Sequence, residues 1–156
     1  MKGNETVIAR LNQALNDELT AVHQYILDAE MVENWGYGQL APLIKKQAIE
    51  EMKHAERLIE RILFLEGVPN MAGPFAVQPA SGVKAVFENQ LQMELGAVKA
   101  YNESALICAQ NGDHGSKELF EALLKDEEEH TDFLETQLSV IEQIGLENYL
   151  VEQLRS

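Results

Sequence analysis

The chain has 156 residues, of which 46% are hydrophobic and only 10 are glycine and 4 proline, so it suits one domain with a packed core and does not resemble a disordered segment. Lys and Arg number 12 against 26 Asp and Glu, and the formal charge of −14 argues against nucleic acid or an anionic membrane as a partner. Cations are the natural partners of this composition, although acidic helix surfaces also serve solubility alone.

The cysteine count and the hydropathy of the chain indicate in which cellular compartment the protein works. The single cysteine, Cys108, excludes an intrachain disulfide, a cysteine-based zinc site and an iron–sulfur site built from this chain alone. The first 15 residues lack the apolar run of a signal peptide, and no window approaches the roughly 20 apolar residues that a membrane span needs. We therefore expect a soluble cytoplasmic protein with no membrane partner.

Helical periodicity dominates the first half of the chain. Apolar residues recur at helical spacing from residue 5 to about residue 34 without a proline, and the sequence WGYG at 35–38 ends this first helix. A second helix begins near Pro42, because the first turn of a helix tolerates proline, and runs to about Glu66, where Gly67 closes it.

The second half repeats the pattern after a long irregular connection. Residues 67–82 contain three of the four prolines and three of the ten glycines, and a connection of this length can cross a bundle from end to end. A third helix runs over about 81–110, and a fourth, N-capped by Asp113, runs to Ile144. The remaining residues predict a short fifth helix. Strand signals are absent, so the fold class is all-α: a four-helix bundle in one domain, residues 1–156, with a long crossover between helices two and three.

The two halves share an internal repeat. The segment ELTAVHQY at 18–25 aligns with ELGAVKAY at 94–101, a shift of 76 positions, with five of eight residues identical. The same shift relates three further pairs, which are Glu51 with Glu127, His54 with His130, and Glu50 with Asp126. Two similar helix hairpins can pack together without any function, but leucines would then repeat best. Here Glu, His and Tyr repeat beside apolar neighbours, where ionisable residues need partners or a metal.

Six of these residues form a candidate metal site. Residues three apart on a helix share a face, so each Glu-x-x-His pair presents an oxygen and a nitrogen to one point. One such pair arises by chance in a glutamate-rich helix, whereas two copies, each preceded by a helix with an equivalent Glu, are hard to dismiss. Four Glu and two His are the pattern already known from ferritin-like di-iron and di-manganese proteins. The candidate ligands are Glu18, Glu51, His54, Glu94, Glu127 and His130.

Hard carboxylates with one imidazole per metal suit Fe(II), Fe(III) or Mn(II). The expected arrangement has Glu51 and Glu127 as bridges, with Glu18 and His54 completing one metal and Glu94 and His130 the other. Without metal, some of these acids would take up protons. Two tyrosines, Tyr25 and Tyr101, follow Glu18 and Glu94 by two helical turns, and either pack in the core or contact the ligands.

Over essentially its whole length the chain resembles the bacterioferritins, the haem-containing branch of the ferritins. The resemblance rests on NDELTAVHQY at 16–25, EEMKHAERLIERILFLEG at 50–67, Glu94, and DEEEH at 126–130. It implies a ferritin-like bundle, a ferroxidase centre that oxidises Fe(II) to Fe(III) with dioxygen or peroxide, and a shell of twenty-four copies built from dimers around a ferric mineral.

The resemblance also implies a haem site and pores. Met52 matches the residue that ligates haem b at a twofold dimer interface, paired with the same residue of a neighbouring subunit, although interface packing is the simpler role for a methionine. On a helix Met52 points about 100° away from Glu51, which fits an outward role. Residues matching pore positions are Asn34, Glu66, Asp132 and Asn148. One departure is Lys46, which stands where some members have an inner-surface histidine.

The favoured function is iron storage with ferroxidase activity, with a small ferredoxin supplying electrons through haem to release the mineral. One alternative is a di-iron oxygenase or peroxidase on the same bundle, since fold and ligands alone do not fix the reaction. Against it, the chain has no CxxC pair and little room for an organic substrate. A second alternative is a non-enzymatic haem-binding bundle.

Overall fold

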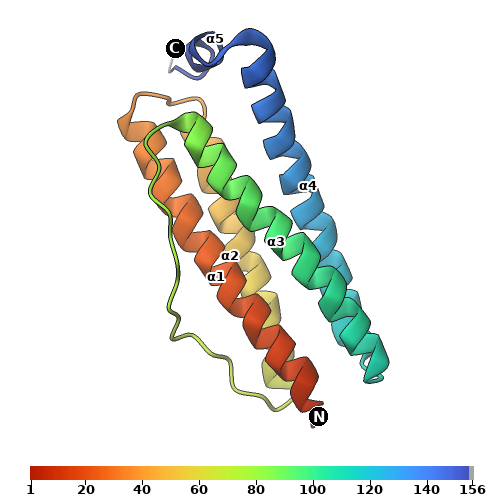
Figure 1. Cartoon of the computed structure of the whole chain (residues 1–156). Coiled ribbons are helices and arrows are strands. Elements are labelled where there is room, and N and C mark those ends of the chain that lie inside the picture. Colours follow the sequence, from red (N-terminus) through yellow and green to blue (C-terminus); the bar gives the residue numbers. More distant parts are fainter. Residues whose placement is uncertain (155–156) are drawn as a thin grey trace.

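The computed structural model describes residues 1–154, and the regular secondary structure in that range is entirely helical (Figure 1). Its five helices are α1 (Glu5–Asn34), α2 (Ala41–Phe64), α3 (Val83–Gln110), α4 (His114–Ile144) and the short α5 (Leu146–Val151). The predicted all-α four-helix bundle with a short fifth helix is confirmed. No helix in the described part of the chain is both long enough and apolar enough to cross a membrane.

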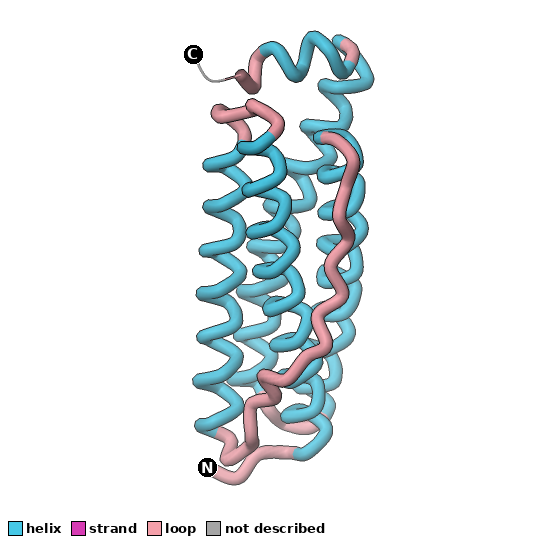
Figure 2. The backbone as a smooth tube through the Cα atoms, turned by 90° about the vertical axis from the view of Figure 1, so that its left-hand side faces the viewer, coloured by secondary structure: helices cyan, strands magenta, loops and turns pink. Residues whose placement is uncertain are grey.

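The bundle consists of two helix hairpins. α1 packs mainly on α2 and α3 mainly on α4, and α1 also contacts α3 across the bundle. The segment 65–82 runs along the length of the bundle from the end of α2 to the start of α3 (Figure 2). This is the predicted end-to-end crossover, and α5 lies at the end of the bundle beyond α4 (Figure 1).

Side-chain caps determine where two of the helices begin. The Asn4 side chain accepts a hydrogen bond from Val7 N at 3.1 Å and so caps α1. Asp113 caps α4 by accepting from Ser116 N at 2.9 Å, as its place before the helix predicts. Each cap satisfies a backbone N–H that has no partner within the helix.

The end of α2 differs from the prediction by two residues. The helix ends at Phe64, and the residue in the left-handed conformation beyond it is Glu66, with φ of 62°. Gly67 N donates to Ile62 O at 2.9 Å, which closes the helix as in a Schellman motif. Glycine at 67 has a packing reason instead, because a Cβ there would lie 2.8 Å from Ile8 Cγ2 on α1.

Amide side chains of α1 hold the crossover against the bundle. Gln24 accepts from Gln78 N at 2.8 Å and donates to Gln78 O at 3.0 Å. Nearer the start of α1, Asn12 binds the crossover through both its amide atoms, and Asn16 donates to it once. These amides satisfy backbone groups of an extended segment and hold it against the first hairpin.

The apolar core is divided into two clusters by a polar layer. One cluster lies toward α5 and includes Phe87 and Tyr149, and the other lies toward the N-terminus and includes Leu11 and Phe120. On each of the four long helices the residues of the two clusters are separated by one to three buried polar residues. The polar layer therefore lies at one level of the bundle, which is where the candidate ligands occur.

Candidate metal centre

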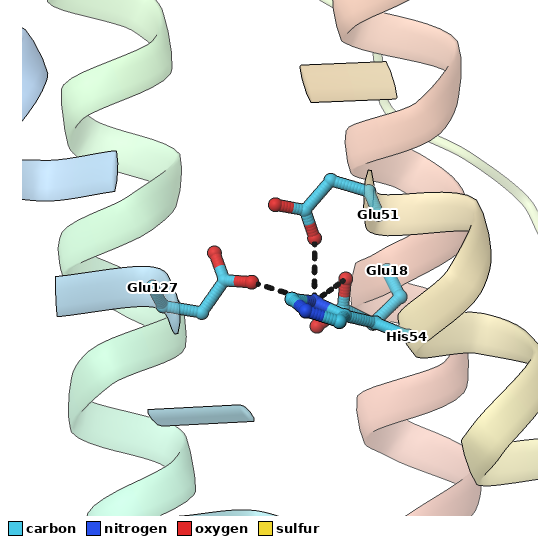
Figure 3. Close-up of side chains that lie close together, drawn as sticks. All are labelled: Glu18, Glu51, His54 and Glu127. Carbon is cyan, nitrogen blue, oxygen red and sulfur yellow. Dashed lines mark ion pairs between the residues drawn. The ribbon is translucent and has the colours of Figure 1, made fainter. Parts of the chain in front are cut away.

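The structure brings all six candidate ligands together in the polar layer. Each is at most 6% exposed, and they come from all four long helices: Glu18, Glu51, His54, Glu94, Glu127 and His130. Figure 3 shows the His54 ring surrounded by the carboxylates of Glu18, Glu51 and Glu127. Two hairpins therefore contribute to one centre, as the internal repeat predicts.

The ligand atoms form two overlapping groups. Glu18, Glu51, His54 and Glu127 each offer one atom, and these atoms lie within 4.8 Å of one another. Glu51, Glu94, Glu127 and His130 form a second group by the same measure. Glu51 and Glu127 belong to both groups, so the geometry suits two neighbouring cations that share two carboxylates.

Each histidine turns its Nδ1 atom toward the acids. His54 Nδ1 lies 3.0 Å from Glu127 Oε1, and His130 Nδ1 lies 2.9 Å from Glu51 Oε1. The two rings are nearly parallel, with centroids 6.4 Å apart and an angle of 19°. Both imidazoles therefore present the same atom to the centre, one on each side of the shared carboxylates.

The outer nitrogens are held by two further carboxylates. His54 Nε2 lies 2.8 Å from Asp126 Oδ2 of α4, and His130 Nε2 lies 2.9 Å from Glu50 Oε2 of α2. A carboxylate on Nε2 holds the proton on that nitrogen and leaves the Nδ1 lone pair for a metal. Sequence reasoning paired Glu50 with Asp126 through the repeat but assigned them no role. Their position one residue before each ligand Glu was the signal.

The two tyrosines hydrogen-bond to the ligands reciprocally. Tyr25 on α1 donates to Glu94 Oε1 on α3 at 2.5 Å, and Tyr101 on α3 donates to Glu18 Oε1 on α1 at 2.5 Å. Both rings are also fully buried in the core, so packing and ligand contact occur together. Each bond holds one carboxylate oxygen and leaves Oε2 of Glu18 and of Glu94 without a partner.

Unsatisfied buried atoms mark the centre. Within residues 1–154, seven buried side-chain nitrogen or oxygen atoms have no hydrogen-bond partner, and six of them belong to the six candidate ligands, one on each. The seventh is Gln47 Oε1. Such atoms are costly unless something binds them, and here they converge. Four carboxylates and two imidazoles suit iron or manganese, so the residues fit a pair of these cations.

In the metal-free centre, burial and the contacts just described shift the pKa values of the candidate ligands. Burial raises the pKa of Glu51 and that of Glu94 well above the usual range. Burial acts in the same direction on Glu127, but the neighbouring Glu94 carboxyl and the two histidines hold its pKa low. Burial alone would lower the pKa of His54 and that of His130, but the surrounding carboxylates raise both. The centre therefore holds protons that an arriving cation must displace.

The residues predicted from family resemblance lie apart from this centre. Met52 on α2 is 45% exposed. The four pore candidates are all exposed, and the structure does not bring them together within one subunit: Asn34, Glu66, Asp132 and Asn148. Asn34 ends α1, whereas the Glu66 carboxylate lies 3.5 Å from the N-terminal amine near the start of α1. A pore from these residues requires several subunits.

Two helix hairpins joined by one long crossover, with paired Glu-x-x-His helices around a buried carboxylate layer, define a ferritin-like protein. The comparison with protein families agrees, because residues 8–144 match the ferritin-like domain. Among curated proteins the chain is similar to bacterioferritins over 96% of its length. It therefore belongs to the bacterioferritin family.

The relatives are similar in length as well as in sequence. The chain is 48% identical to the bacterioferritin of Brucella melitensis and covers 92% of that protein. It is 43% identical to the one from Rhodobacter capsulatus, with 92% covered, and 38% identical to the one from Mycobacterium leprae, with 94% covered. The match is thus to whole proteins rather than to a shared module.

Proposed function

We propose that the protein is an iron-storage ferroxidase, which oxidises Fe(II) to Fe(III) at the buried centre and retains the product inside a shell of many subunits. The observation that carries the proposal is the convergence of six buried atoms without hydrogen-bond partners, one from each candidate ligand. Membership of the bacterioferritin family supports the assignment of iron as the metal.

Fe(II) is the substrate of the centre. Glu51 and Glu127 bridge two ions, Glu18 and His54 complete one position, and Glu94 and His130 complete the other. Each Fe(II) loses one electron, and the two electrons with two protons reduce dioxygen to hydrogen peroxide, which is itself a second oxidant. Carboxylate ligands favour the ferric product because hard oxygen donors bind the higher charge more strongly.

The proposal extends to haem at a subunit interface. The Met52 thioether is 45% exposed and lies on the α2 face directed away from the ligands, with Ile49, 43% exposed, one turn before it. Two such faces from two copies would bury these apolar side chains and give haem b an axial methionine from each subunit. Haem would supply a path for electrons to the stored mineral, delivered by a small ferredoxin.

The complete assembly in this proposal is a cytoplasmic shell of twenty-four copies built from dimers. Pores between subunits are lined by the exposed polar residues already described, which are Asn34, Glu66, Asp132 and Asn148. The buried free thiol of Cys108 is compatible with a reducing compartment. Gel filtration of the purified protein should give a particle many times the subunit mass of 17.5 kDa.

An aerobic Fe(II) titration tests the function. A storage ferroxidase oxidises many irons per subunit, because product leaves the centre for the shell cavity. A di-iron oxygenase without storage stops at about two irons per subunit. A bundle that only binds haem oxidises none, and either of these last two outcomes would overturn the proposal.

A further inference from the structure

A small cavity lies beside the metal centre, next to the candidate ligand His130. Its volume is about 10 Å³, which is close to the space that one water molecule needs. All four long helices contribute to its walls, and much of the lining is apolar, with two such side chains from α2 and two from α4: Leu43, Ile44, Phe133 and Leu134. A polar atom that faces this space therefore has few groups to bind.

Gln47 of α2 brings an unsatisfied polar atom to this cavity. Its side chain lines the space, and its Oε1 atom is buried without a hydrogen-bond partner. Among residues 1–154 it is the one such side-chain atom that does not belong to a candidate ligand. A pair of cations accounts for the other six atoms, so this oxygen needs a different partner, since a buried acceptor without one is destabilising.

Two other polar side chains at the cavity have hydrogen-bonding capacity left. The Tyr25 hydroxyl donates to Glu94 Oε1, and its oxygen can still accept a hydrogen bond. Gln90 Nε2 donates to Asp28 Oδ2 at 2.9 Å, and an amide has a second N–H to donate. With Gln47 Oε1 these groups offer a water molecule two acceptors and one donor, and buried waters typically make about three hydrogen bonds.

The internal repeat does not reproduce this polar environment. The equivalent of Gln47 in the other half is Leu123, which is fully buried. One turn before it, Phe120 packs its ring on that of Tyr101, with centroids 5.7 Å apart. The two tyrosines make equivalent hydrogen bonds to the ligands, but Tyr25 shares a cavity with a polar acceptor, whereas Tyr101 packs on an aromatic ring.

We propose that this cavity binds one water molecule, which donates hydrogen bonds to Gln47 Oε1 and to the Tyr25 hydroxyl oxygen. Gln47 is then a positioning residue. Through the water it orients the Tyr25 hydroxyl, which holds one oxygen of Glu94 and leaves the other for a cation. A phenol that accepts a hydrogen bond also donates more strongly, because hydrogen bonds in a chain polarise one another. The inference rests on the metal centre of the proposed function and not on its oxidation chemistry.

Crystal structures of the assembled, metal-free protein test the water site directly. The wild type should show one ordered water within hydrogen-bond distance of Gln47 Oε1 in each subunit. Gln47→Leu introduces the side chain found at the equivalent position of the repeat and should exclude the water, whereas Gln47→Glu keeps an acceptor and should retain it. A high-resolution wild-type structure without density beside Gln47 overturns the proposal.

Raman spectra of the metal-free protein test the contact between the water and Tyr25. The intensity ratio of the tyrosine doublet differs between a phenol that only donates a hydrogen bond and one that also accepts. Gln47→Leu should therefore shift the ratio toward that of a donor, and the same substitution in a Tyr25→Phe background should change nothing. An equal shift in both backgrounds, or no shift in either, would show that the water does not act on Tyr25 and would overturn the positioning role.

Anaerobic Co(II) titration measures the consequence at the metal centre. Gln47→Leu should weaken one of the two binding positions about threefold, which is less than the tenfold or more expected when a direct partner of a ligand is lost. Gln110→Leu makes the same substitution at the exposed end of α3 and should leave both positions unchanged. Wild-type affinity at both positions in Gln47→Leu would contradict the positioning role. A protein that shows the water and the Co(II) response but oxidises no Fe(II) would overturn the proposed function and leave this inference standing.

Discussion

Two regions of the bundle bury carboxylates, and they do so in opposite ways. In the metal centre, four Glu side chains each leave one oxygen without a hydrogen-bond partner, and these oxygens face one another. Asp28, fully buried on α1, instead has both oxygens satisfied, by Gln24 Nε2 at 3.0 Å and Gln90 Nε2 at 2.9 Å.

The difference teaches how a ligand site can be told from a structural network. Amide donors complete the Asp28 carboxylate, and Gln24 also holds the crossover through Gln78, so this network joins α1, α3 and the loop. The centre has buried acids in excess of donors, a state that only protons or metal ions can balance. Buried polar atoms that lack hydrogen-bond partners and converge predict a binding site. Buried polar groups whose hydrogen bonds are complete predict a stabilising network.

The largest effect should come from a ligand shared by both metal positions. Glu51→Gln should lower the rate of Fe(II) oxidation on the order of 100-fold, because an amide is a poor bridging ligand. In the metal-free protein the same change should cost little thermal stability, because burial raises the pKa of Glu51 and so already disfavours its charged form. Oxidation assays and calorimetry measure the two effects.

The control for that variant is Glu56→Gln on the exposed surface of α2, which should alter neither quantity. A normal oxidation rate in Glu51→Gln would contradict the bridging role. A large fall in the thermal midpoint without metal would instead show that Glu51 is part of a stabilising network, as Asp28 is.

Asp28 should affect how the free energy of unfolding depends on pH, and should not affect iron oxidation. Burial raises its pKa to about 6 from an ordinary value of 3.8, although hydrogen bonds from Gln90 and Gln24 oppose the shift. As pH rises from 4 to 6 the unfolded chain ionises before the folded one, so this stability contribution is present below pH 4 and lost by about pH 6. The loss is on the order of 2 kcal/mol.

Chemical unfolding of metal-free wild type and Asp28→Asn across this pH range checks the prediction. The wild-type free energy of unfolding should fall relative to that of the variant as pH rises, whereas iron oxidation at neutral pH should be similar in both. Parallel pH profiles for the two proteins would show that Asp28 ionises as easily in the fold as in the unfolded chain.

The cluster of candidate ligands could be predicted because its sequence signal is local and duplicated. Glu51 and His54 are three residues apart on one helix, and the repeat reproduces them as Glu127 and His130. The Asp28 network has no such copy, since the repeat equivalent of Asp28 is Ser104. Its partner on α3 depends on how the helices pack, which the spacing along one helix does not encode.

Tertiary contacts also explain the other departures. Gly67 suggested a helix end by its identity, but its absent side chain serves the approach to Ile8, and Glu66 takes the left-handed position instead. Likewise, the small cavity beside Gln47 is lined by residues from all four long helices, which are far apart in sequence. The local sequence pattern predicts the helices and the candidate ligands. The packing of the helices decides which residues become hydrogen-bond partners and where cavities lie between the helices.

Asp126 and Glu50 fall between the two kinds of carboxylate compared above, because they are partly exposed yet bind the buried histidines. Asp126→Asn should weaken Fe(II) binding about tenfold, since a neutral amide oxygen is a weaker acceptor for the His54 Nε2 proton than the carboxylate it replaces. Glu50→Gln should have a similar effect through His130, because the repeat places both pairs equivalently. Anaerobic Fe(II) titration of each variant measures the affinity.

The loss of Fe(II) affinity should depend on where the carboxylate lies, and not on the removal of one negative charge. Glu129→Gln removes the same charge from an exposed site on α4 and should leave Fe(II) affinity unchanged. If Asp126→Asn and Glu50→Gln also bind Fe(II) as tightly as wild type, the two hydrogen bonds are incidental to the histidines. If only one of the two variants weakens binding, the two metal positions differ despite the repeat. Only one histidine would then depend on its outer carboxylate.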